Sequence, residues 1–214
     1  MNSSRIPHFL IGWRAFKAQP RVFFTSMLLL FASWVVLELA VFATQRHFTL
    51  ETWLGIAIWA VLHLAFLVVF SGLAAGLVVI SGEVLGGREP RLEILFGSMK
   101  RGPQVLLALC LYLLGVAAGL VLLVVPGIYF AVRYAMFGQV VATTEASAVE
   151  SLRAAGALSK GRWRAMCGFW MRVWLLNLAG AAFLGGGLLV TVPVSLLAAG
   201  SYYRSLAQPA APSA

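Results

Sequence analysis

Residues 53–80 read WLGIAIWAVLHLAFLVVFSGLAAGLVVI, and this run decides the fold class. It is almost wholly apolar, and His63 is the single ionisable residue within it. A helix crosses the hydrocarbon core of a bilayer with roughly 20 apolar residues, so this run is long enough to cross at a tilt. The sequence therefore predicts an all-α protein whose helices lie in lipid.

The composition of the whole chain leads to the same class. Of its 214 residues, 61% are hydrophobic and 11% are charged. A soluble domain is about 45–50% apolar and about 25% charged, and a domain of this size has too little interior to bury the excess apolar surface. The net charge of +9 does not indicate nucleic-acid binding, because the basic residues stand between long apolar runs.

The apolar runs predict a polytopic transmembrane helical bundle of six spans. The first run is longer than the roughly 7–15 apolar residues of a cleavable signal, so we expect it to be retained. The predicted spans are Val22–Ala43, Trp53–Ile80, Val105–Val125, Ile128–Thr143, Ala165–Leu184 and Leu188–Tyr203. Together they form one transmembrane domain, residues 1–204, which precedes a disordered Pro/Ala-rich tail, residues 205–214.

Three features are expected to interrupt these helices. Pro126 and Gly127 are predicted to end the helix of span three before span four begins. A run of glycines, residues 185–187, makes a tight turn between spans five and six. Pro193 should kink the last span, and most such kinks are structural, although a kink can also serve a gate.

Basic residues give the orientation of the six spans. Connections on the cytoplasmic side carry an excess of Lys and Arg. If the spans alternate, only Arg46 falls on one side, and these residues fall on the other: Arg5, Arg14, Lys17, Arg21, Arg88, Arg91, Lys100, Arg101, Arg153, Lys160, Arg162, Arg164 and Arg204. Both termini are therefore predicted to be cytoplasmic. The same basic residues fit anionic lipid headgroups, which topology alone would also explain.

The three predicted cytoplasmic segments share a plan. WRAFKAQPRVFF, LFGSMKRGPQVLL and GALSKGRWRAM precede spans one, three and five. The second has apolar residues Leu92, Leu95, Phe96 and Met99 at the spacing of a helix that lies on an interface. The pattern favours three repeats of an amphipathic helix plus a helical hairpin. The alternative is that any interfacial helix before a span looks like this.

Residues 126–170 carry a family resemblance. They read PGIYFAVRYAMFGQVVATTEASAVESLRAAGALSKGRWRAMCGFW, in which a Pro-Gly-Ile-Tyr turn, a span with an Arg, and a helix ending in Leu-Ser-Lys-Gly follow one another. Residues 86–102, GGREPRLEILFGSMKRG, add a Gly-x-x-Pro loop and an amphipathic helix. This chain resembles a group of bacterial inner-membrane proteins that includes the YciC-like proteins and the membrane domain of some glycerophosphoryl diester phosphodiesterases. The resemblance implies a six-span inner-membrane module and supplies no reaction, because the phosphodiesterase chemistry belongs to a separate soluble domain.

Four polar residues inside the predicted spans are candidate site residues. An ionisable group at mid-bilayer costs roughly 2.5–3.5 kcal/mol on insertion scales, so each is a functional candidate. Glu38, Arg133 and Asn177 are predicted at comparable depth in the outer half, and His63 lies near the middle of span two. The functional interpretation is a polar centre that binds an anionic headgroup or relays a proton. We favour the structural one, an ion pair between Glu38 and Arg133 that fixes the helix register.

Two Gly-x-x-x-Gly pairs are candidates for helix packing. Gly72 and Gly76 lie in span two, and Gly115 and Gly119 lie in span three. This spacing lets helix backbones approach closely. We expect the two pairs to pack spans two and three against each other within the chain, and dimerisation is the alternative.

No motif indicates catalysis, a metal site or a cofactor. The chain has no Asp, no His-Glu-x-x-His, no Gly-x-Ser-x-Gly and no P-loop. Glu83 and Glu89 flank a Gly-rich loop without a His or Cys to complete a metal site, and Cys110 and Cys167 stand alone in apolar runs. The leading hypothesis is a non-enzymatic scaffold or accessory module for envelope or lipid processes, with protein partners or a second copy of itself.

The runner-up is a small transporter or lipid-handling protein built around Glu38, His63 and Arg133. A membrane-embedded enzyme is the third hypothesis.

Overall fold

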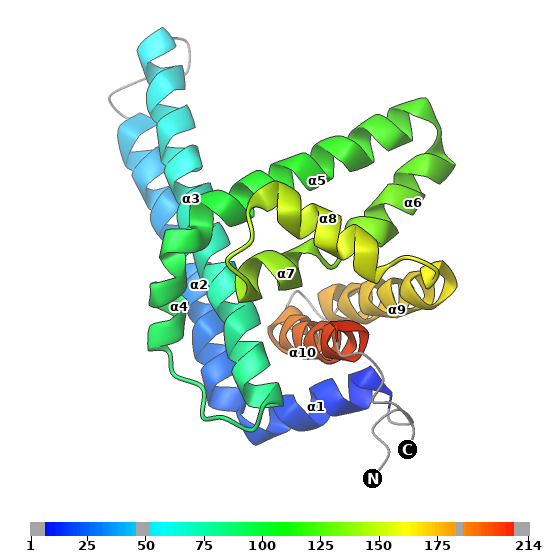
Figure 1. Ribbon diagram of the computed structural model, residues 1–214. Coiled ribbons are helices and arrows are strands. Elements are labelled where there is room, and N and C mark those ends of the chain that lie inside the picture. The colour runs from blue at the N-terminus through cyan, green and yellow to red at the C-terminus, as the bar shows by residue number, and fades with distance from the viewer. Residues whose placement is uncertain (1–6, 46–51, 183–185, 208–214) are drawn as a thin grey trace, which may run out of the picture.

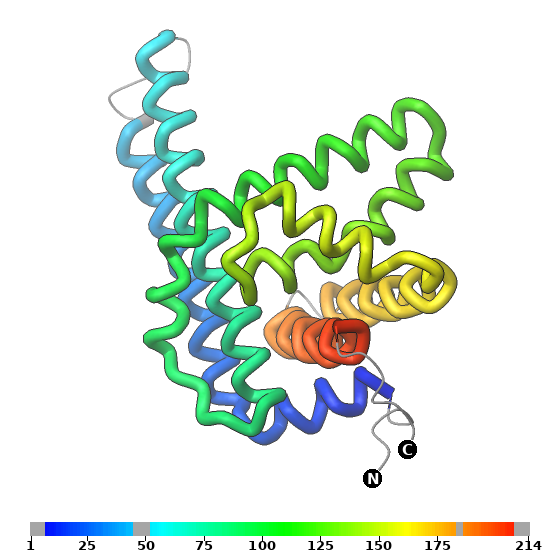
Figure 2. Tube along the Cα trace, viewed as in Figure 1, coloured from blue at the N-terminus to red at the C-terminus, as the bar shows by residue number. Residues whose placement is uncertain are grey.

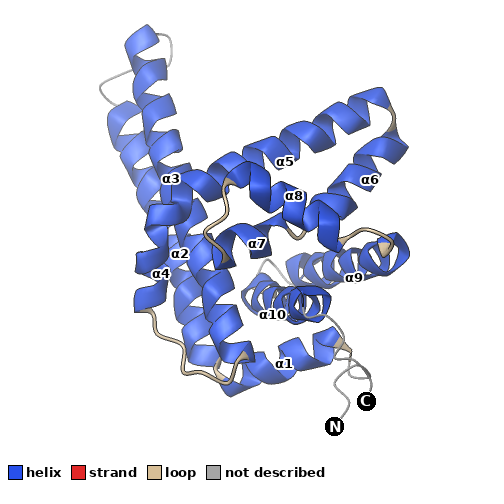
Figure 3. Cartoon of the chain, viewed as in Figure 1, coloured by secondary structure: helices blue, strands red, loops and turns tan. Residues whose placement is uncertain are grey.

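The computed structural model describes residues 7–45, 52–182 and 186–207. In these ranges all regular structure is helical, as Figure 3 shows, so the all-α prediction is confirmed. Four described helical segments are long and apolar enough to cross a membrane: Pro20–Thr44, Trp53–Leu85, Glu93–Leu122 and Val124–Thr143. A membrane protein is therefore supported.

The helices follow one another in three groups (Figure 1). Each group begins with one or two short helices that precede a long one, and the second group also ends with a short helix. The first group is α1 (His8–Ala18), α2 (Pro20–Gln45) and α3 (Trp53–Leu85). The second is α4 (Glu93–Gly97), the 3₁₀ helix η2 (Ser98–Arg101), α5 (Gly102–Leu122), α6 (Val124–Tyr134) and α7 (Phe137–Thr143). The third is α8 (Ala148–Leu158), α9 (Trp163–Ala182) and α10 (Leu188–Ala207).

The three pairs of long helices point in different directions. In Figures 1 and 2, α2 and α3 run side by side up the left of the view, α5 and α6 extend to the right, and α9 and α10 are seen nearly end-on. Six spans of one bilayer would lie closer to parallel, with tilts of roughly 0–40°. This arrangement therefore differs from the bundle that the sequence predicted.

Helix α10 joins two hydrophobic cores at the centre of the molecule. Leu197 packs with Phe23, Ile80 and Leu95 from the first two groups. On another face of α10, Ala198 and Tyr202 pack with Met136 and with residues of α8 and α9. Burying this apolar surface is worth roughly 25 cal/mol per Å². The C-terminal half of α3 and parts of all three helix groups therefore pack against α10.

Helix α1 docks on α10 where a glycine allows close approach. A Cβ atom on Gly12 of α1 would lie 2.8 Å from the carbonyl oxygen of Val194 in α10. His8 reinforces this contact, because its Nδ1 lies 3.0 Å from the Ser201 hydroxyl oxygen. Helix α8 begins at a capping box, in which Ser147 and Glu150 satisfy each other's backbone N–H groups.

The break between α5 and α6 lies three residues before the predicted one. Leu123 has extended backbone angles, φ −166° and ψ 148°, and α6 begins at Val124. Pro126 stands in the first turn of α6, where the backbone N–H has no intrahelical partner, so proline is tolerated. Gly127 lies against α5, since a Cβ atom there would be 2.7 Å from the backbone nitrogen of Leu120.

Span four and the C-terminal end of the last span also differ from the prediction. Span four, predicted as 128–143, consists of α6 and α7 with a turn at Ala135 and Met136. Helix α10 continues through Pro193 and includes residues 205–207 of the predicted tail. Residue 185 of the predicted glycine turn lies outside the described residues, as does Arg46.

Candidate functional site

The four polar residues predicted to form one cluster have separate surroundings. Glu38 lies on the exposed surface of α2, with no hydrogen bond or ion pair to any described residue. The His63 Nδ1 atom lies 2.9 Å from the Trp59 carbonyl oxygen, and the two rings are 4.0 Å apart between centroids. Asn177 of α9 donates through Nδ2 to the Ser195 hydroxyl of α10, over 2.9 Å.

Arg133 binds its own helix, so the predicted ion pair with Glu38 is wrong. Its Nη1 donates to the Tyr129 hydroxyl over 2.6 Å, and its guanidinium lies over the rings of Tyr129 and Tyr134. The predicted pair depends on the depth of each residue along its own helix, and it requires all spans to be parallel. Because α2 and α6 belong to pairs that point in different directions, equal depth does not bring their side chains together.

Instead, a cavity of about 450 Å³ gathers charged side chains at the junction of α3, α4–η2, α7 and α10. We call it the basic cavity. Its charged lining residues are Glu83, Arg88, Lys100, Arg101 and Arg204. Four cations and one carboxylate thus line this cavity together with the buried Gln139, which is 6% exposed.

The end of α3 builds one wall of the basic cavity. The helix continues to Leu85, one turn beyond the predicted span, and carries Glu83. Gly87 then turns the chain with φ +71°, a left-handed conformation that favours glycine. Arg88 is thereby directed back to Glu83, and its Nη2 donates to Oε1 over 2.9 Å. The hydrogen bond to Glu83 raises the pKa of Arg88.

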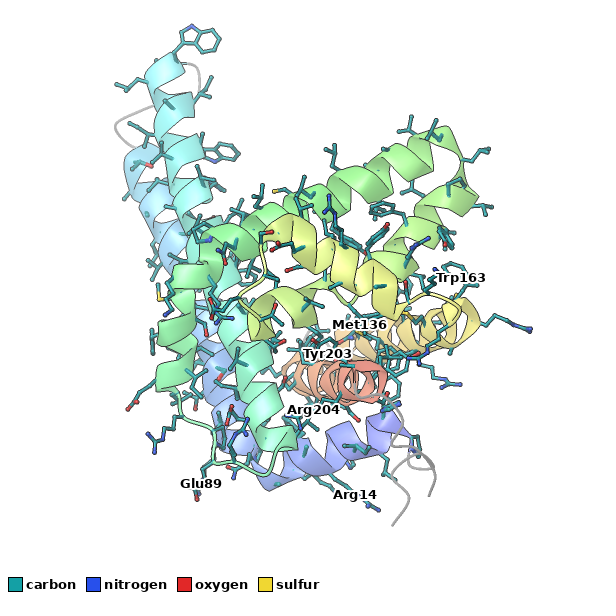
Figure 4. The ribbon with its side chains drawn as sticks, in the orientation of Figure 1. Arg14, Glu89, Met136, Trp163, Tyr203 and Arg204 are labelled. Atoms are coloured by element: carbon teal, nitrogen blue, oxygen red, sulfur yellow. The ribbon has the colours of Figure 1, made fainter. Side chains whose placement is uncertain are left out.

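Two further arginines fix the other walls through backbone carbonyl groups. Arg204 in the last turn of α10 donates to the Gly82 oxygen of α3 over 2.5 Å. Figure 4 shows Arg204 between the end of α10 and the lower end of α3, while Glu89 and Arg14 point outward. Arg101 donates to the carbonyl oxygens of Ala142 and Thr144 over 2.9 and 3.0 Å, at the end of α7.

The charge of the basic cavity is only partly balanced. Arg101 also donates to Glu145 over 2.5 Å, but the Glu145 side chain is 92% exposed and lies outside the cavity lining. Lys100 is exposed and has no hydrogen bond or ion pair within the described ranges. Even when Glu145 is counted, four cations face two carboxylates, so the cavity favours an anion.

An apolar cavity of about 680 Å³ lies beside the basic cavity, between α2, α3 and α10. Its lining is wholly apolar and includes Phe31, Trp34, Phe66 and Phe70. Val78 of α3 lines both cavities. A charged region and an apolar region thus adjoin at one residue of α3.

The two glycine pairs pack within the chain, but not against each other's helices. A Cβ atom on Gly72 or Gly76 would lie 2.6 Å from the Cα atom of Met99 or Leu95, in η2 and α4. A Cβ atom on Gly119 of α5 would similarly lie 2.8 Å from the Cα atom of Gly127 in α6. The prediction that these pairs join spans two and three is wrong, because α3 uses its pair to dock the intervening short helices.

From the sequence, the basic residues indicate the cytoplasmic side and a general fit to anionic headgroups, but no particular site. Sequence reasoning missed that Lys100, Arg101 and Arg204 meet in one cavity, and it missed Gln139. The available signal was a polar residue at 139 within a run that was otherwise expected to face lipid. In the ranges that the structure covers, no three His, Cys, Asp or Glu side chains are grouped to hold a metal ion.

No family model, curated protein or solved structure matches this chain. The resemblance to the YciC-like proteins thus remains a hypothesis that rests on residues 86–102 and 126–170. Function has to be argued from the geometry of the chain itself.

Proposed function

We propose that this protein is a non-enzymatic, multi-pass protein of a bacterial inner membrane that binds an anionic phospholipid at the cytoplasmic face. Lipid binding would serve an accessory role in envelope or lipid processes. The basic cavity is the observation that carries the proposal, because its four cations exceed the carboxylates that reach them.

The side chains of the basic cavity match a phosphate-containing headgroup. Arg binds phosphate oxygens through paired N–H groups, and Lys binds them as a point charge. Arg88 and Lys100 are exposed at the rim, where an arriving headgroup can reach them. Each basic residue near a membrane surface adds roughly 1 kcal/mol of attraction for anionic lipid.

The adjoining apolar cavity favours a lipid over a soluble anion. An acyl chain is the partner that an aromatic and aliphatic lining accepts in a membrane. Because Val78 lines both cavities, a headgroup in one places the start of an acyl chain beside the other. One phospholipid can therefore satisfy both regions.

We further propose six spans with both termini in the cytoplasm, on grounds that are separate from the basic cavity. This topology is supported by the one-sided distribution of Lys and Arg and by the repeated order of short and long helices. Six spans would require the three helix pairs to align along the membrane normal. Reporter fusions at residue 48 test it, and a cytoplasmic signal there would exclude this layout.

Native mass spectrometry of the purified chain tests lipid binding. Phosphatidylglycerol and phosphatidylcholine are added separately to wild type, Lys100→Gln and Arg88→Gln. Each substitution should weaken phosphatidylglycerol binding about fivefold, the equivalent of roughly 1 kcal/mol. Phosphatidylcholine binding should change little.

Arg91→Gln is the matched control, because Arg91 lies in the same connection and is exposed outside the cavity lining. Equal weakening by Arg91→Gln would show that only the general surface charge matters, and the proposal would fail. It would also fail if wild type did not distinguish the two lipids.

A further inference from the structure

A second cavity, of about 280 Å³, lies between α6 and the connection from α8 to α9. Its two charged lining residues are Arg133 and Lys160, and Tyr129 and Trp163 form an aromatic wall. We propose that this second cavity binds a phosphate group between Arg133 and Lys160. The two cavities share no lining residue, so this site is separate from the basic cavity.

The chain turn after α8 assembles the second cavity. Gly161 has φ +74°, which lets the chain reverse and start α9 at Trp163. Lys160 and Trp163 are thereby brought to the same side as the end of α6. The Trp163 ring then packs on Tyr129, with 5.1 Å between ring centroids, and Figure 4 shows Trp163 at this end of α9.

Arg133 has an unused donor at this site. Its Nη1 donates to the Tyr129 hydroxyl, whereas its Nε is buried without a hydrogen-bond partner among the described residues. A buried N–H of a charged group is destabilising when it lacks an acceptor. Arg133 lines the second cavity, so an oxyanion bound there meets its positive charge, and a shift of the side chain would let the buried Nε donate to that oxyanion.

The charges around the second cavity favour an anion. Its lining contains no carboxylate, and neither ion pair in the described part of the chain involves Arg133 or Lys160. The end of α8 could oppose an anion through its free carbonyl groups. Three of these carbonyls, on residues 155, 156 and 157, already accept hydrogen bonds from Ser159 and Lys160.

The size of the second cavity restricts the ligand. Pockets for drug-sized molecules measure roughly 300–1,000 Å³, so this one fits a phosphate group with a small substituent. A tetrahedral oxyanion can accept from a guanidinium and an ammonium at once. The phosphate can be inorganic or can belong to a lipid headgroup that enters beside Trp163.

Two binding measurements on the full chain in mild detergent separate these sources. In the first, inorganic phosphate is titrated while the fluorescence difference between wild type and Trp163→Phe is followed. In the second, native mass spectrometry counts phosphatidic acid molecules bound per chain. Arg133→Gln and Lys160→Gln should each weaken binding about tenfold or more, in whichever of the two measurements detects binding to wild type.

Arg153→Gln on α8 is the control, because Arg153 is exposed and does not line the second cavity. Binding of phosphatidic acid alone, with the same dependence on Arg133 and Lys160, would identify a headgroup as the source. Lys160→Gln keeps the test valid if Arg133→Gln does not fold, since Lys160 is exposed.

The proposal is overturned if neither ligand binds, or if Lys160→Gln binds as wild type does. It is also overturned if Arg153→Gln has the same effect as Lys160→Gln. Lys100→Gln should leave this site unchanged, so failure here is distinguishable from failure of the basic cavity.

Discussion

The glycine pair of α3 and the glycine pair of α5 have the same spacing but different neighbours. Gly72 and Gly76 are buried against the backbone of η2 and α4. Gly115 faces the Phe130 side chain, and the half-buried Gly119 faces the backbone of α6. The Gly-x-x-x-Gly spacing therefore indicates that another helix approaches closely, but it does not indicate which helix this is or how rigid the contact is.

The difference follows from what each contact holds. The α3 pair docks the short segment that carries Lys100 and Arg101 into the basic cavity. The α5 pair closes two apolar helices whose other faces are exposed. A backbone neighbour cannot move without its helix, whereas a ring can turn, so we expect a substitution at Gly115 to cost less than one at Gly76.

The largest effect is expected for Gly76→Ala. The new Cβ would lie 2.6 Å from Leu95 Cα and 2.9 Å from its carbonyl oxygen, so α4 must shift as a whole. We expect the free energy of unfolding in mixed micelles to fall by about 3 kcal/mol. Gly82→Ala on the same helix is the control, because nothing lies within 4 Å of its added Cβ. If both variants were equally stable, the contrast between the two pairs would be lost.

An intermediate effect is expected for Arg101→Ala, which tests the same docked segment from its other side. It removes the hydrogen bonds from Arg101 to the Ala142 and Thr144 carbonyl oxygens. Arg101 is 23% exposed, so we expect a loss of about 1–2 kcal/mol in unfolding free energy. Glu145→Gln should change little, because an ion pair with an exposed partner contributes little. A larger loss for Glu145→Gln would assign the anchoring to the ion pair instead.

The smallest effect is expected for Gly115→Ala. Its Cβ would meet the Phe130 ring, which can turn toward the exposed side, and we expect a loss below about 1 kcal/mol. Gly115→Ala combined with Phe130→Leu should recover most of that loss in the same unfolding experiment. A cost as large as that of Gly76→Ala would show that the α5 pair is as rigid as the α3 pair.

Much of the secondary structure could be predicted because apolar length is a local property. The helices α2, α3 and α5 begin and end within a few residues of the predicted runs. The end of α5 was misplaced because residues 120–125 are uniformly aliphatic, and no side chain marks Leu123 as the residue with an extended backbone.

The candidate site could not be predicted because its parts come from distant segments. Glu83, Lys100, Gln139 and Arg204 lie on four different elements. Their meeting depends on how the helix groups pack around α10, and hydrophobic periodicity does not contain that information. The Glu38–Arg133 pair failed for the same reason, since it assumed one common direction for all long helices.

The tip between α5 and α6 has a consequence for how the chain enters a membrane. Its five aliphatic residues, 121–125, are 62–87% exposed, and no charged residue occurs from 102 to 132. Insertion of this hairpin moves no charge through hydrocarbon, whereas the connection from α2 to α3 contains Arg46 and Glu51. In the proposed six-span topology, the second hairpin would therefore insert without moving a charge across the membrane, whereas the first would carry both charges across.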